Sequence, residues 1–133
     1  MGRVLGLDYG EKRVGVAISD EDQEHVFTRP IILNRGKRDL FRELGQLVEQ
    51  EGVERIVVGL PLTLRGERGQ QATSIQSVMC ELEEALTIPV DFEDERLTSA
   101  YAARFPESSA GADSIAAAAI LESYLERQRR PTA

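Results

Sequence analysis

Cysteine and histidine are scarce in this chain of 133 residues, which contains one of each, Cys80 and His25. A single cysteine cannot form a disulfide within the chain, and this usage suits a reducing compartment. One histidine and one cysteine cannot supply the usual ligands of a zinc site. His25 also lies in a predicted strand, remote from any suitable nucleophile, so a Ser-His-Asp catalytic set is not expected.

Long apolar segments are missing too. No apolar run reaches the ~18 residues that a membrane-spanning helix requires, and no charged-then-apolar leader opens the chain. We therefore expect a cytoplasmic protein with no membrane partner. The GxxxxGK[ST] pattern of P-loop nucleotide-binding proteins is absent as well.

Positive charge is in short supply, since the net charge is -7. A general nucleic-acid coat protein depends on neutralising phosphates, so this class is disfavoured. An enzyme that combines an acidic metal site with a local basic rim remains compatible with the charge.

The composition is that of a globular protein, with 41% hydrophobic residues, 11 glycines and 5 prolines. The length is sufficient to bury a core. We expect one domain over residues 1–130, followed by a short tail over 131–133.

Hydrophobic patterning predicts three strands, then a helix, a strand, a helix, a strand and two helices. The strands are expected at 3–8, 13–19, 25–33, 55–60 and 89–95, and the helices at about 40–51, 72–86, 97–105 and 113–130. Pro30 favours an edge position for the third strand, Asp39 is a candidate N-cap and Gly52 a candidate helix stop. The predicted fold is α/β, with a mixed five-stranded sheet flanked by helices. A three-strand antiparallel meander is joined in it by two parallel strands.

Acidic residues follow the predicted strands at the points where each strand ends. Asp8 comes directly after the apolar run at 4–7, Asp94 and Glu95 end the fifth strand, and Asp113 begins the last helix. Because sites gather at the carboxyl ends of parallel strands, we expect these side chains to converge. Clustered carboxylates repel one another unless a cation lies among them, and oxygen ligands suit Mg²⁺ or Mn²⁺. Two such ions are a common device for phosphodiester cleavage.

Each of these acids also has a simpler interpretation. Asp8 could pair with Lys12 or Arg13, Asp94 and Glu95 could be solvated charges at a strand end, and Asp113 could be an N-cap. The joint placement of the acids favours the metal site over these separate explanations.

Basic and aromatic residues near the acids are candidate nucleic-acid contacts. The candidates are Lys12, Arg13, Arg65, Arg68 and Arg96, with Tyr9 able either to stack on a base or to cap the sheet edge. The basic residues of the final "RQRR" are interpreted as solubilising charge at a helix end.

Four motifs together resemble the bacterial YqgF family of Holliday junction resolvase-like proteins, also described as pre-16S rRNA nucleases. They are "GLDYGEKRVGVAISD", "IVVGLPL", "DFEDERLTSAYA" and "DSIAAAAILESYLE", in this order over nearly the whole chain. The resemblance implies an RNase H-like fold and a metal-dependent nuclease with Asp8, Glu95 and Asp113 as catalytic acids. It also implies a role in maturing the 5′ end of 16S ribosomal RNA or in resolving DNA junctions.

The chain departs from the family pattern just before Asp113. Many relatives carry a longer Lys/Arg-rich loop there, whereas "RFPESSAGAD" is short and contains only Arg104 as a cation. A four-way junction presents a large charged surface, so this departure disfavours the junction and favours precursor ribosomal RNA as the substrate. A dimer would suit a junction resolvase, but no interface is evident in the sequence.

Two other classes of function compete with the nuclease as interpretations of the sequence. The stretch "LGLDYGEKRVGVAI" also resembles the first phosphate motif of actin-like and sugar-kinase ATPases, but these need two domains and a second phosphate loop. A catalytically silent RNA- or protein-binding scaffold would leave three carboxylates without a compensating cation, which is unfavourable.

Overall fold

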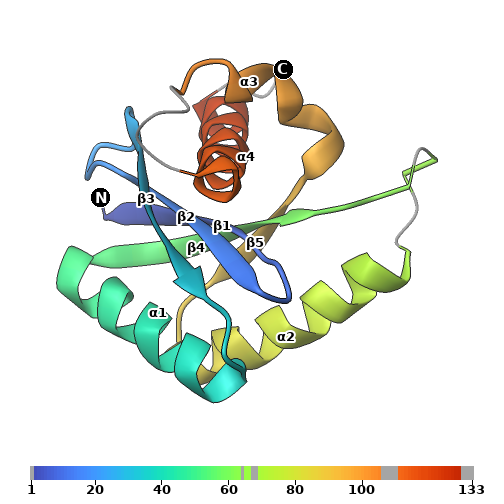
Figure 1. The fold of residues 1–133 in the computed structure, drawn as a ribbon. Helices are drawn as coiled ribbons and strands as arrows, with labels where there is room; N and C mark the ends of the chain where they lie inside the picture. The colour runs from blue at the N-terminus through green and yellow to red at the C-terminus, as the bar shows by residue number, and fades with distance from the viewer. Residues whose placement is uncertain (1, 64, 67–68, 106–110, 130–133) are drawn as a thin grey trace.

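The computed structural model describes residues 2–63, 65–66, 69–105 and 111–129 (Figure 1). In this part of the chain, five strands form one mixed sheet in the order β3-β2-β1-β4-β5. The strands are β1 (Arg3–Asp8), β2 (Arg13–Ser19), β3 (Val26–Leu33), β4 (Val53–Leu60) and β5 (Val90–Asp94). The helices are α1 (Lys37–Glu51), α2 (Gln70–Leu86), the 3₁₀ turn η1 (Glu95–Leu97), α3 (Ser99–Ala102) and α4 (Ala112–Arg129).

The pairing of the strands confirms the predicted fold. β1 and β2 are antiparallel, as are β2 and β3, whereas β1, β4 and β5 run parallel to one another. β3 lies at one edge of the sheet, as Pro30 predicts, because proline cannot donate a hydrogen bond to a second neighbouring strand. The carboxyl ends of β1, β4 and β5 therefore share one end of the sheet.

Helices cover both faces of the sheet (Figure 1). α1 and α2 pack on one face, where Leu5, Leu7 and Ile56 meet Leu40 and Met79. On the other face, α4 packs over a smaller core built from its alanines, Ile120 and Leu121. β4 lies between two parallel neighbours and is nearly all apolar, as is typical of a strand that is buried on both faces. No helix in the described ranges is both long enough and apolar enough to cross a membrane.

Local boundaries differ from the predictions at a few points. Asp39 is not the N-cap of α1, because Gly36 occupies that position and Asp39 lies in the first helical turn. Gly52 does end α1, in the left-handed conformation that glycine adopts without strain. β5 ends at Asp94, so Glu95 belongs to η1 and not to the strand. The predicted tail at 131–133 lies outside the described residues.

The beginning of α4 rests directly on the backbone of β2. A Cβ atom on Gly15 would lie 1.9 Å from the carbonyl oxygen of Asp113 and 3.0 Å from the nitrogen of Ser114. Any side chain at this position would therefore force the helix away from the sheet. The absence of a side chain at Gly15 is what allows Asp113 to reach the end of β1.

We expect Gly15→Ala to lower the free energy of unfolding by about 3 kcal/mol, because backbone atoms at the contact cannot step aside as a flexible side chain would. Thermal unfolding followed by circular dichroism measures the effect, with a fall in Tm of about 10 °C expected. Gly111→Ala is the matched control, since nothing lies within 4 Å of a Cβ atom there. Equal stability of the two variants would contradict the proposed role of Gly15.

Candidate active site

Asp8 ends β1 and is the centre of the acidic cluster. The buried run Val4–Leu7 carries it to the end of the sheet, where it pairs in register with Gly15 of β2. Burial, the charges of Glu95 and Asp113 and a hydrogen bond with Glu95 together raise the pKa of Asp8 to about 7, and burial is the largest of these causes. The pKa of Asp8 therefore depends on both other acids, which come from elements far away in the sequence.

Glu95 reaches Asp8 because the neighbouring strand leaves room for it. A Cβ atom on Gly59 of β4 would lie 2.9 Å from Cγ and 3.0 Å from Oε1 of Glu95. Burial raises the pKa of Glu95, the hydrogen bond from Asp8 lowers it in part, and the charge of Asp94 raises it. The two acids thus share a hydrogen bond in a partly desolvated position.

Asp94 is engaged by Arg96 and serves a structural purpose. Its carboxylate caps η1 by accepting a hydrogen bond from the Arg96 backbone nitrogen at 2.9 Å. It also accepts hydrogen bonds from Nε of Arg96 at 3.0 Å and from Nη2 at 2.6 Å. The Arg96 guanidinium holds the pKa of Asp94 below its ordinary value. Both oxygens of the Asp94 carboxylate thus accept hydrogen bonds from Arg96.

Asp113 is the second residue of α4 and not its N-cap. The carbonyl of Gly111 accepts the first hydrogen bonds of the helix, from the backbone nitrogens of Ser114 and Ile115. The Asp113 side chain instead accepts a hydrogen bond from Nε of Arg13 at 3.1 Å. The predicted pairing of an acid with Arg13 thus exists, but with Asp113 and not with Asp8.

Ser114 fixes the first turn of α4 to the sheet. The register of β2 and β3 shifts between Val14 and Val16, which frees the Val16 nitrogen and the Arg29 carbonyl from the ladder. The Ser114 hydroxyl accepts from the Val16 nitrogen at 3.4 Å and donates to the Arg29 carbonyl at 2.6 Å. The irregular pairing of β2 and β3 was not predicted from the sequence. Ser114, the serine next to Asp113 in "GADSIAA", is the residue whose hydroxyl fills it.

The donor set suits a hard divalent cation. Asp8 and Glu95 offer carboxylate oxygens of the kind that Mg²⁺ and Mn²⁺ prefer, and burial is the main cause that raises the pKa of both acids. Across the described residues, no three acidic, histidine or cysteine side chains already stand together in a metal-ligating arrangement. Asp113 is within electrostatic reach of Asp8, but its Oδ2 accepts a hydrogen bond from Arg13. The residues could therefore hold a metal if the Asp113 side chain joined the other two acids.

The shifted pKa of Asp8 predicts a dependence of stability on pH. The unfolded carboxyl loses its proton near 3.8 and the folded one near 7, so the native protein holds the extra proton between these values and stability falls as pH rises. We expect Asp8→Asn to raise the free energy of unfolding at pH 8, with EDTA present, by about 1–2 kcal/mol after allowance for solvent screening. The gain should vanish near pH 4. Denaturant unfolding at several pH values measures it.

Asp20→Asn is the control for this prediction. Burial alone would raise the pKa of Asp20. Hydrogen bonds from the backbone N–H groups of His25 and Glu24 outweigh it and hold that pKa below its ordinary value. Removing that carboxylate should lower stability at neutral pH, which is the opposite sign. Loss of stability in Asp8→Asn at pH 8 would contradict an uncompensated acidic cluster.

The remaining predicted nucleic-acid contacts differ in exposure. Lys12 and Arg65 are exposed, and Arg68 lies outside the described residues. Tyr9 is half-buried against the core between the sheet and α2, where it lines a pocket with Gln71 and Ser74. Base stacking by Tyr9 stays a prediction.

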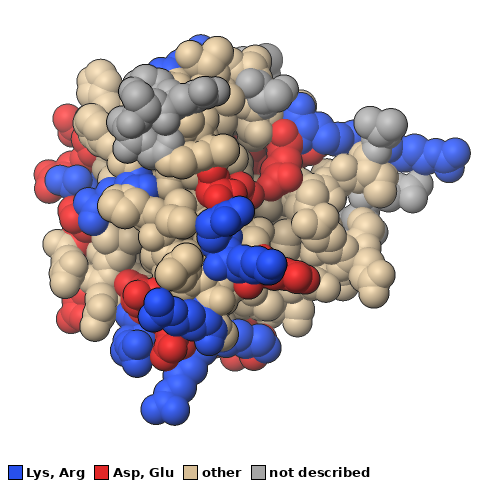
Figure 2. All heavy atoms as spheres, in the orientation of Figure 1, with Lys and Arg blue, Asp and Glu red and all other residues tan. Residues whose placement is uncertain are grey.

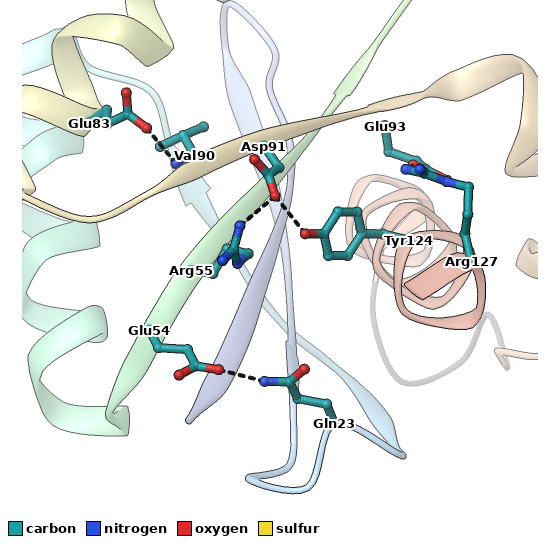
Figure 3. Close-up of polar contacts among 9 residues, drawn as sticks. All are labelled: Gln23, Glu54, Arg55, Glu83, Val90, Asp91, Glu93, Tyr124 and Arg127. Carbon is teal, nitrogen blue, oxygen red and sulfur yellow. Dashed lines mark hydrogen bonds and ion pairs between the residues drawn. The ribbon is translucent and has the colours of Figure 1, made fainter. Parts of the chain in front are cut away.

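The far half of α4 is held by partly buried and buried polar contacts that sequence patterns did not reveal (Figure 3). The Asp91 carboxylate lies between Arg55 and Tyr124, accepting hydrogen bonds of 2.6 Å from both. Burial and the hydrogen bond to Asp91 raise the pKa of Tyr124 to about 12. This contact ties α4 to β4 and β5 together.

A second contact lies further along β5. Glu93 is only 1% exposed, and its carboxylate accepts hydrogen bonds from Ser123, at 2.6 Å, and from the Arg127 guanidinium. Figure 3 shows Arg127 folded back over Glu93. The interpretation of this arginine as solubilising charge is therefore wrong, because it neutralises a buried acid. Its partner could not be identified from the sequence, where the two residues are 34 positions apart.

We expect Arg127→Ala to destabilise the protein by about 3 kcal/mol, because it leaves the buried Glu93 charge without a counter-ion. Arg129→Ala is the matched control, since Arg129 donates to the exposed backbone carbonyls of Gln23 and Glu24 and contacts no buried acid among the described residues. Urea unfolding of both variants measures the difference. Equal losses would show that Arg127 acts as general surface charge.

The chain is similar to proteins of a known family. A family model described as "RuvX: Holliday junction resolvase" matches residues 2–127. The chain belongs to the RuvX family. Within it, a Chloroflexus aurantiacus protein is 41% identical over 134 residues, covering 95% of this chain and 88% of that protein. A Syntrophomonas wolfei protein is 39% identical over 132 residues, covering 93% and 94%. Both are named "Putative pre-16S rRNA nuclease".

Solved structures support the RNase H-like fold of this RuvX chain. Thermus thermophilus RuvC, in a complex with a Holliday junction substrate, superposes with a TM-score of 0.69 at 11% identity, covering 96% of both chains. The yeast mitochondrial Holliday junction resolvase Ydc2 superposes with a TM-score of 0.58 at 14% identity, covering 96% of this chain and 79% of that one. At such low identity these likenesses establish the fold alone. The family predicted from the four sequence motifs and the predicted fold are confirmed.

Proposed function

We propose that this protein is a metal-dependent nuclease that hydrolyses phosphodiester bonds, with Asp8, Glu95 and Asp113 as the catalytic acids. The observation that carries the proposal is the raised pKa of Asp8, which arises from burial and from the proximity of the other two acids. Membership in the RuvX family supports it, because the family model is described as a resolvase. Acids placed close together destabilise their charged forms, and a bound cation would relieve that repulsion.

The same three carboxylates are the proposed ligands of Mg²⁺ or Mn²⁺, with Asp94 kept apart by Arg96. The chemistry supplied by two such bound ions is activation of a water and stabilisation of the leaving oxygen. The chain itself has separate tasks. Asp8 can hold or release a proton near neutral pH, while Lys12 and Arg13 offer positive charge for the phosphate at the same end of the sheet.

Precursor 16S ribosomal RNA is the proposed substrate, in maturation of its 5′ end. The relatives that cover nearly the whole chain carry the corresponding name. Arg104, the only Lys or Arg between Arg96 and Asp113, pairs with Glu122 and Glu126 at 3.5 and 3.4 Å, so it is engaged within the protein. On the face in Figure 2, basic side chains alternate with acidic ones and form no broad basic surface. These features suit a single strand better than a four-way junction.

Resolution of Holliday junctions is the second candidate function. It is favoured by the description of the family model that matches residues 2–127. A resolvase cuts two symmetric strands, which would require a dimer of this chain.

A side-by-side substrate panel tests the proposal. Purified protein should cut RNA containing the 5′ precursor sequence of 16S ribosomal RNA when Mg²⁺ or Mn²⁺ is present, and EDTA should stop the cutting. Asp8→Asn should lower the rate by at least about 100-fold, because it removes a ligand charge at the reacting centre. Gel electrophoresis of labelled substrates measures both effects.

The panel also contains unstructured RNA and a four-way DNA junction. Asp20→Asn, which alters a carboxylate outside the site, is the matched control and should cut at the unaltered rate. Preferential cutting of the junction would reverse the order of the two candidates. Cutting by Asp8→Asn at the unaltered rate would refute the assignment of the acids.

A further inference from the structure

Arg13 is the cation that Asp113 contacts in the structure. Its Nε atom lies 3.1 Å from Oδ2 of Asp113, across 100 residues of sequence. The two side chains are 59% and 38% exposed, so water and ions can reach the pair. The pair lies beside Asp8, whose pKa responds to the Asp113 charge.

The backbones on both sides of this pair are held in place. Arg13 is the first residue of β2, and the hairpin before it is anchored to the end of β3 by Asn34. The Asn34 side chain donates to the Gly10 carbonyl at 2.9 Å, and its backbone nitrogen donates to the Lys12 carbonyl at 2.9 Å. On the other side, Asp113 is fixed by the contact of α4 with Gly15. Only the two side chains are therefore free to exchange partners.

This arrangement explains why the three acids are not yet arranged as metal ligands. Asp8 and Glu95 share a hydrogen bond, while the carboxylate of Asp113 is engaged by Arg13. A divalent cation that takes Oδ2 of Asp113 as a ligand competes with the guanidinium for that oxygen. The displaced guanidinium stays tethered beside the site because its backbone cannot move away.

We propose that Arg13 competes with the divalent cation for Asp113 and, once displaced, binds a phosphate of the substrate. Arg13 is thus a positioning residue that couples metal binding to nucleic-acid binding. This inference rests on the proposed function, since it concerns the same acids. By thermodynamic reciprocity, if the bound metal raises the affinity for nucleic acid by some factor, bound nucleic acid raises the affinity for the metal by the same factor.

The strengths of the two interactions support an exchange. An exposed ion pair is weak and easily displaced, whereas a guanidinium can bind phosphate through two parallel hydrogen bonds. Release from Asp113 therefore gives Arg13 a better partner when substrate is present. Lys12, next in sequence and also exposed, has no such contact with an acid of the cluster in the described structure.

Mn²⁺ titration of the protein without nucleic acid tests the competition. We expect Arg13→Gln to bind Mn²⁺ about two- to fivefold more tightly than Lys12→Gln, because only the arginine occupies a ligand. Both variants lose one positive charge at adjacent positions, so the comparison removes the general electrostatic effect. Electron paramagnetic resonance of free Mn²⁺ gives the dissociation constants. Equal constants for the two variants would overturn the proposal and leave the proposed function intact.

A second measurement tests the coupling. Fluorescence anisotropy of a labelled single-stranded RNA, with and without Ca²⁺, gives the gain in affinity due to a divalent ion. The unaltered protein and Lys12→Gln should both gain affinity, and Arg13→Gln should lose most of that gain. An equal gain in Arg13→Gln would overturn the coupling. Failure of the unaltered protein to bind Mn²⁺ at all would instead overturn the proposed function together with this inference.

Discussion

The close contact between α4 and the backbone of β2 determines the rest of the candidate site. It exists because Gly15 has no side chain where the carbonyl of Asp113 arrives. Gly15 is also the register partner of Asp8, so the space that admits the helix lies directly beside the first acid. Gly59, on the other side, makes the corresponding room for Glu95. Two missing side chains thus set the positions of two acids around a third.

The electrostatic character of the site follows from that packing. Bringing carboxylates together in partial burial is unfavourable, and the structure responds in three ways. Asp8 and Glu95 share a hydrogen bond, Asp113 is engaged by Arg13, and Asp94 is engaged by Arg96. At the opposite half of α4 the same problem is solved for Glu93 by a permanent counter-ion, Arg127. The exposed ion pair at one end of α4 and the buried acid with its counter-ion at the other give the two ends of the helix different surroundings.

Much of the fold could be predicted from sequence because its signals are local. Apolar runs bounded by turn residues, Pro30 at an edge and Gly52 after a helix each report on their own neighbourhood, and the mixed five-stranded sheet inferred from such signals is confirmed. The clustering of the acids followed from the rule that parallel strands end together. The partners of the two arginines could not be predicted in this way. The pairs Arg13–Asp113 and Arg127–Glu93 depend on side-chain directions across the sheet. The irregular pairing at Val14 to Val16, which receives Ser114, likewise has no periodic signature.

The contacts that seat α4 join the beginning of the chain to its last described helix. Ser114 and Val16 are 98 residues apart, and Arg13 and Asp113 are 100 residues apart. Closing loops of this length costs chain entropy before the contacts that reward it are made, and proteins rich in such contacts fold slowly. The geometry of the candidate site therefore depends on contacts between the beginning of the chain and its last described helix, so a change that loosens α4 from the sheet would disturb the acids without touching any of them.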